Sequence, residues 1–137
     1  MDTISQLEYL GEEIEEKTVE FLENELLKKA EKLGFINENS IYYLKNLFIK
    51  YYNTVLFIFN KDKMIKMENY KDNIKISVIN YDEVKGLECL LDKDGNHKLF
   101  FKINNTEECL DAKNDTDEEH IKEYNLIIQD ILIQLAI

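Results

Sequence analysis

The stretch ISVINYDEVKGLECLLDKDGNHKLFFKI, residues 76–103, decides the fold class. It contains short runs of β-branched, aromatic and other apolar residues that are separated by polar, turn-forming residues, a pattern typical of antiparallel strands. The clearest turn is Asp94-Gly95, because glycine readily adopts the positive φ that a tight hairpin needs. The stretch therefore predicts consecutive strands joined by hairpins.

The same pattern extends to both sides of this stretch. Turn residues separate further short apolar runs, so strands are expected at 54–60, 64–68, 74–80, 84–91, 98–103 and 108–113. Residues 41–49 fit two interpretations: Asn39 or Ser40 is suited to cap a helix, whereas the aromatic content favours a strand. The sequence thus predicts a small antiparallel barrel or bent sheet of six to seven strands over residues 41–113.

Helical periodicity occupies both ends of the chain. Apolar residues recur every three or four positions through residues 1–35, and Gly34 follows three lysines, which is a common helix end. Residues 116–136 predict a closing C-terminal helix, with Thr116 and Glu119 as a capping box. The whole chain, 1–137, is expected to form one α+β domain with a helical N-terminal segment.

The C-terminal helix is apolar on two faces. Its expected core face comprises Ile121, Tyr124, Ile128, Ile131, Leu132 and Leu135. A second stripe, Leu126, Ile133 and Ile137, lies opposite, and a helix with two apolar stripes usually makes contacts on both sides. Either the N-terminal helix covers this second stripe, which is the favoured interpretation, or the stripe is a partner or dimer surface.

Charge limits the choice of partners. The chain has 28 acidic residues, 17 lysines and no arginine, giving a net charge of −11. This charge repels nucleic acid and anionic membranes, so we expect neither as a partner; a basic protein or peptide is more suitable. The charge is unevenly distributed, because residues 1–40 carry a net −7 and residues 41–75 a net +4. The strongest acidic candidates for partner contacts lie in the N-terminal segment: Glu12, Glu13, Glu15, Glu16 and Glu20.

The compartment is inferred from the N-terminus and the cysteines. The N-terminal residues show no export signal, and two cysteines are too few for a disulfide scaffold, so we expect a cytoplasmic protein with reduced thiols. The abundance of Ile, Asn and Lys without Arg is typical of AT-rich bacterial genomes. We expect a monomer or a weak homodimer.

The order of elements resembles bacterial pleckstrin-homology-like (PH-like) domains. VLFIFNKDKMIKM (55–67) is similar to their early strand, turn and strand, and residues 76–103 are similar to their later strands and glycine-containing hairpin. With the closing helix, the resemblance covers residues 41–137. It implies a non-catalytic scaffold that binds peptides, proteins or lipid head groups. The lipid-binding members carry basic first loops, and the nearest match, Lys61, Lys63 and Lys66, is too weak to predict phosphoinositide binding.

Motifs for catalysis or metal binding are sparse. His120 and Glu123 are spaced to share a helix face, yet two ligands make a poor metal site, and His97 is expected to be exposed after its turn. Asp92, Asp94 and Asn96 alternate as in a calcium loop, but Gly95 falls at the fourth position instead of the sixth, and Ile103 stands at the twelfth, where that loop has glutamate. No nucleophile motif or glycine-rich phosphate loop occurs. We therefore expect no enzyme, cofactor or metal.

Two function classes remain. The leading prediction is a non-enzymatic PH-like module that binds a protein or peptide. The alternative is an acidic inhibitor or immunity-type protein that neutralises a basic partner such as a nuclease or toxin, since charge complementarity accelerates capture.

Overall fold

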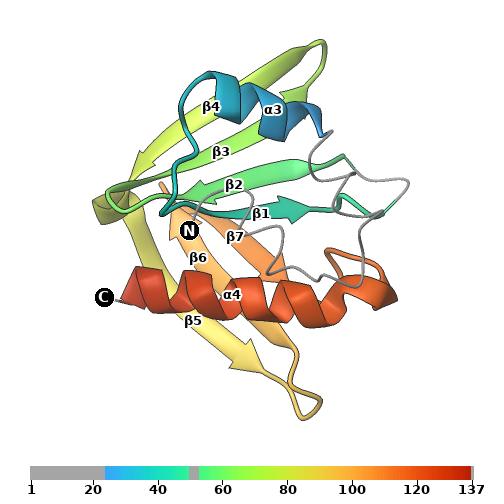
Figure 1. Ribbon diagram of the computed structural model, residues 1–137. Coiled ribbons are helices and arrows are strands. Elements are labelled where there is room, and N and C mark those ends of the chain that lie inside the picture. The colour runs from blue at the N-terminus through green and yellow to red at the C-terminus, as the bar shows by residue number, and fades with distance from the viewer. Residues whose placement is uncertain (1–23, 50–52, 137) are drawn as a thin grey trace.

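The computed structural model describes residues 24–49 and 53–136 and has an α+β architecture (Figure 1). The N-terminal helix of the described part is α3 (Glu25–Lys32), and the C-terminal helix is α4 (Ile121–Ala136). Seven strands lie between them: β1 (Ile41–Lys45), β2 (Val55–Phe59), β3 (Lys63–Tyr70), β4 (Asn73–Asn80), β5 (Val84–Leu91), β6 (His97–Ile103) and β7 (Thr106–Asp111). Two 3₁₀ turns precede β5 and α4: η1 (Tyr81–Glu83) and η2 (Glu118–His120).

Among the described residues, hydrogen bonds divide the seven strands between two antiparallel sheets and do not join them into a closed barrel. One sheet has the order β1-β2-β3-β4, and the other has the order β5-β6-β7. The predicted strand content and the antiparallel pairing are confirmed, and residues 41–45 form a strand. The ambiguity over 41–49 is thereby resolved in favour of the aromatic, β-favouring interpretation.

Turn residues account for the hairpins. Gly95 has a φ of 85°, as expected for the β5–β6 hairpin, and Asp92 accepts hydrogen bonds from the backbone N–H groups of Asp94 and Asn96. Asn104 and Asn105, with φ values of 50° and 69°, form the two-residue connection between β6 and β7. Asparagine tolerates this left-handed region better than most residues, so the local sequence fixes both turns.

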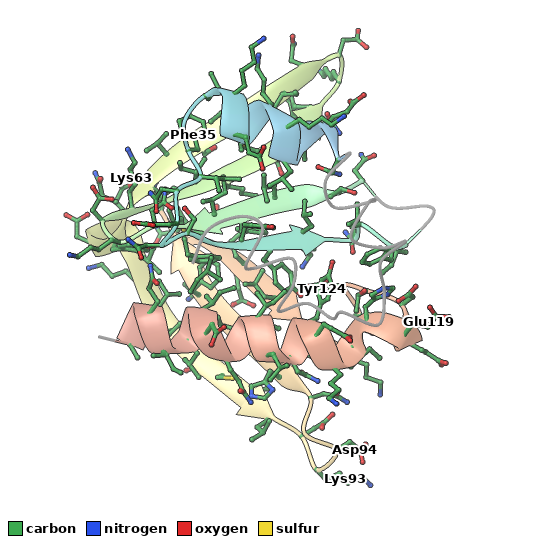
Figure 2. The ribbon with its side chains drawn as sticks, in the orientation of Figure 1. Phe35, Lys63, Lys93, Asp94, Glu119 and Tyr124 are labelled. Atoms are coloured by element: carbon green, nitrogen blue, oxygen red, sulfur yellow. The ribbon has the colours of Figure 1, made fainter. Side chains whose placement is uncertain are left out.

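The main core lies between the two sheets. The Phe101 ring on β6 meets the rings of Phe57 and Phe59 on β2 edge-on, with centroids 6.4 Å apart in each case. The strand period of two places these side chains on one face of the β1–β4 sheet, which is also the face that α4 reaches through the Tyr43–Tyr124 ring contact. Tyr124 points from α4 toward this sheet (Figure 2).

The short helix α3 packs on the other face of the β1–β4 sheet. Its N-cap residue Asn24 accepts hydrogen bonds from Leu26 N and Leu27 N, and Gly34 ends the helix with a φ of 77°, as predicted. Leu26, Leu27 and Ala30 are buried in the same apolar cluster as the sheet. The helical prediction for residues 1–23 lies outside the described residues.

The closing helix starts later than predicted. The 3₁₀ turn η2 comes first, with Asp117 at its N-cap position, and the α-helix begins at Ile121. The sequence pattern placed the cap at Thr116 because serine and threonine are favoured there. The N-cap position instead falls at Asp117, whose carboxylate contacts His120 Nδ1 and does not cap the backbone.

Candidate functional site

A groove of about 790 Å³ lies between the C-terminal half of α4 and the start of β5. Its wall is largely apolar, with a few polar groups. The lining residues are Asn39, Ile41, Lys61, Tyr81, Val84, Leu87, Asp130, Ile133, Gln134 and Leu135. A concave, mostly apolar site with few polar groups is the usual form of a binding site, so this groove is the candidate functional site.

Helix α4 supplies one wall because it is apolar on more than one side. Tyr124, Ile128 and Ile131 are buried against the sheets, as the sequence predicted. Ile133 is 62% exposed and turns toward the groove. The helix therefore packs against the sheets with one face and lines the groove with another.

Strand β5 supplies the opposite wall and has a free edge. It pairs with β6 only, so within the described residues the other side of β5 has no strand partner. The pairing is irregular between Lys85 and Glu88, where Gly86 adopts a φ of 64°. Such a bulge re-aims side chains and bends the strand locally, and here Leu87 lines the groove.

Asn60 links the segments at one end of the groove through four hydrogen bonds. Its side chain accepts a hydrogen bond from Ser40 Oγ and donates one to the Phe35 carbonyl at 2.8 Å. Its backbone carbonyl accepts hydrogen bonds from the Tyr81 hydroxyl and from Gln134 Nε2, the latter at 2.7 Å. One buried residue thus joins the segment after α3, the end of β2, η1 and α4.

Two ionisable groups in the groove are perturbed by burial. Burial raises the pKa of Tyr81 to about 12, so its hydroxyl stays protonated and donates to Asn60. Burial also raises the pKa of the Asp130 carboxyl above its ordinary value. Within the described part of the chain, Asp130 forms no hydrogen bond or ion pair.

Two of the predicted contact residues, Leu126 and Ile133, lie in the described part of the chain. Ile133 lies in the groove, whereas Leu126, from the same predicted stripe, is half-buried and does not line it. Ile137 lies outside the described residues, as do Glu12, Glu13, Glu15, Glu16 and Glu20. The acidic-inhibitor alternative, which depends on those glutamates, therefore stays a prediction.

Both histidines are buried and contact neighbouring side chains. His97, expected to be exposed, is buried: its backbone N–H donates to Asn125 Oδ1 at 2.8 Å, and Gln129 lies 3.2 Å from its ring. The prediction was wrong because the turn ends before His97 and the strand carries it under α4. His120 is buried with its ring stacked on Phe48, at a centroid distance of 3.9 Å.

Neither cysteine forms a disulfide. Cys89 and Cys109 are free and half-buried, and burial raises the pKa of each thiol. Among residues 24–49 and 53–136, no three His, Cys, Asp or Glu side chains are placed to hold a metal ion.

Several groove residues were not singled out from the sequence. Tyr81, Asp130 and Gln134 line the groove, Asn60 bonds to Tyr81 and Gln134, and none of the four belongs to a sequence motif. Their only sequence signal is indirect, since a polar residue directly after a buried strand, such as Asn60, needs hydrogen-bond partners.

Comparison with protein families places the chain in one family. The model of the family described as "Protein of unknown function (DUF3908)" matches residues 1–126, which is most of the chain. The protein belongs to the DUF3908 family. The matched region contains all seven strands and the first part of α4, and it ends before Asp130. Neither the curated proteins nor the solved structures contain a match.

No helix in the described residues is both long enough and apolar enough to cross a bilayer.

Proposed function

We propose that this DUF3908 protein is a non-enzymatic interaction module that binds an extended peptide segment of a partner protein. The groove between α4 and the free edge of β5 is the observation that carries the proposal. The resemblance of the chain to PH-like domains supports it, because seven strands followed by a closing helix form a binding scaffold in that group.

The edge of β5 offers a way to hold a peptide backbone. A strand at a sheet edge has unpaired N–H and C=O groups, and an added strand completes the ladder while its alternate side chains enter neighbouring pockets. Leu87 and Ile133 give the groove apolar walls for those side chains. The bulge at Gly86 interrupts the ladder, so the peptide pairs with the regular parts of β5 on either side of it.

Asp130 gives the groove a charge preference. Its carboxylate is half-buried, forms no ion pair in the described residues and lies beside apolar side chains, so an incoming lysine or arginine gains a strong partner. Lys61 also lines the groove, but it is exposed and its charge is largely solvated. The preferred peptide therefore alternates apolar residues and carries one basic side chain.

The free thiols support a cytoplasmic location, which is part of this proposal. Cys89 and Cys109 are unpaired, which fits a reducing environment, and we place the protein in the cytoplasm.

A peptide selection tests the proposal. The full chain is immobilised and screened against a phage-displayed library of linear twelve-residue peptides, and enriched peptides are synthesised for fluorescence titration. We expect sequences with alternating apolar residues and a lysine or arginine. Ile133→Lys removes detectable binding because it places a charge on the apolar wall, and Ile133 is exposed enough for the fold to tolerate the change.

Matched variants separate a local charge effect from the effect of net charge. Asp130→Asn weakens binding about tenfold, equivalent to roughly 1.4 kcal/mol, whereas Asp94→Asn has no effect. Asp94 lies at the tip of the β5–β6 hairpin, away from α4 (Figure 2). A selection that enriches no peptide, or binders that Ile133→Lys does not disturb, would overturn the proposed function.

A further inference from the structure

Strand β4 ends the four-stranded sheet with an open edge. It pairs with β3 along eight residues without a register shift, and within the described residues no strand lies on its other side. Proteins usually protect such an edge with lysines, a proline or a bulge. β4 has no bulge and no proline, and Lys75 is its one charged residue.

The same strand carries an exposed apolar stripe. Ile74, Ile76 and Val78 point to one face of the sheet and are 37%, 38% and 54% exposed. Their neighbours across the β3–β4 ladder include Met67 and Ile65, which are fully buried. The apolar face that α3 helps to cover thus continues onto β4, where no described element covers it. Monomeric proteins rarely expose a continuous apolar patch.

The residue pattern of β4 is complementary to itself. If two β4 strands pair antiparallel about a two-fold axis at Ile76, then Ile76 faces its own counterpart and Ile74 faces Val78 of the second copy. Lys75 then faces Ser77, so no like charges lie opposite each other. A second copy of this chain therefore matches both the backbone edge and the apolar stripe.

We propose that β4 is a homodimer interface through which two copies of the chain join their four-stranded sheets into one eight-stranded antiparallel sheet. The contact is isologous, as is usual for two-fold dimers. It lies on a different strand edge from the α4–β5 groove and does not depend on peptide binding there. Because each copy carries a net charge of −11, salt screens their repulsion and tightens the dimer.

Sedimentation equilibrium of the full chain gives the first test. We expect the average mass to rise with concentration from 16.3 kDa toward twice that value. Ile76→Lys places two like charges on the two-fold axis and keeps the protein monomeric, whereas Ile133→Lys in the groove leaves dimerisation unchanged. A wild-type chain that stays monomeric at millimolar concentration, or a dimer that survives Ile76→Lys, would overturn the proposal.

Cysteine cross-linking tests the register and does not depend on the stability of the lysine variant. The register predicts that Ile76→Cys forms a disulfide with its own counterpart under mild oxidation, because residues directly opposite in a ladder have Cβ atoms about 5 Å apart. Ile74→Cys and Val78→Cys each stay uncross-linked alone and form a disulfide when the two variants are mixed. Peptide mapping separates these bonds from any that involve Cys89 or Cys109, and cross-links in another pattern would contradict the two-fold contact.

Discussion

The two sheets meet at one corner and separate at the other. At the first corner, β1 is tied to β7 and the loop after it: Asp115 accepts a hydrogen bond from the Tyr43 hydroxyl at 2.7 Å and lies 3.2 Å from Lys45 Nζ, and its carbonyl accepts from Asn46 N. At the second corner, β4 and β5 diverge on either side of η1 and belong to different sheets (Figure 1).

The two corners are expected to have different roles, one in the stability of the fold and the other in association with a partner. At the tied corner a buried carboxylate has its hydrogen bonds satisfied within the protein, so its polar groups offer little to a partner. At the open corner, β4 and β5 each have one side without a strand partner among the described residues, and apolar side chains lie next to these edges. We therefore expect changes at the tied corner to affect unfolding, and changes at the open corner to affect association.

Asp115→Ala gives the largest expected effect on stability. It removes the acceptor of the Tyr43 hydroxyl and of Asp111 N, and it leaves Lys45 without its carboxylate partner. We expect the free energy of unfolding to fall by about 3 kcal/mol, as measured by urea denaturation, because buried groups lose their partners.

Asp94→Ala serves as the control for that change. Asp94 lies in an exposed turn, so the free energy of unfolding should change by less than about 0.5 kcal/mol. If Asp115→Ala lowers the free energy of unfolding as little as Asp94→Ala does, the contacts of Asp115 do not stabilise the packing of the two sheets.

The second prediction concerns alkaline pH at the same corner. Burial, together with the nearby Asp115 charge, holds the pKa values of the Tyr43 and Tyr124 hydroxyls well above their ordinary value. The folded chain thus keeps protons that the unfolded chain releases above about pH 10. Stability is complete below that pH and falls as the pH rises further, by up to about 1.4 kcal/mol per pH unit for each tyrosine.

Tyr43→Phe isolates this effect. Urea denaturation between pH 8 and 11 should show a shallower loss of stability for the variant than for the wild type, by the contribution of one tyrosine. Tyr70→Phe is the matched control, because Tyr70 is exposed on β3. Equal slopes for all three proteins would show that the buried hydroxyls do not govern alkaline unfolding.

The smallest expected effect distinguishes the two open edges from each other. Raising the salt concentration from about 50 to about 500 mM should weaken binding of a basic peptide to the groove several-fold, because it screens Asp130. The same change should tighten the β4 dimer several-fold, because it screens repulsion between two acidic chains. Peptide titration and sedimentation in the two buffers measure the two affinities. If salt changed both affinities in the same direction, the groove would not bind through charge while β4 pairs through apolar contact.

The local sequence pattern predicted most of the helices, strands and turns. The features that it did not predict depend on contacts between residues distant in the chain. The strand at 84–91 and the turns at Asp94-Gly95 and Asn104-Asn105 follow from alternation and glycine or asparagine chemistry. The start of α4 was misplaced because residues 118–120 form a 3₁₀ turn, and a capping pattern does not distinguish such a turn from the first turn of an α-helix.

The candidate site was largely invisible in the sequence. Ile133 was identified from helical periodicity, but its groove depends on residues from β5, η1 and the β2–β3 turn that only the fold brings together. The hydrogen bond between Tyr43 and Asp115 spans 72 positions, and no local pattern reports such a contact.

Asn60 has a consequence for the thermodynamics of recognition. Because this one residue bonds to Phe35, Ser40, Tyr81 and Gln134, the width of the groove at that end is set before any ligand arrives. A ligand that enters a preformed site loses its own conformational freedom but imposes little extra ordering on the protein. Binding at this end should therefore proceed as docking to a rigid rim, with the conformational cost falling mainly on the peptide.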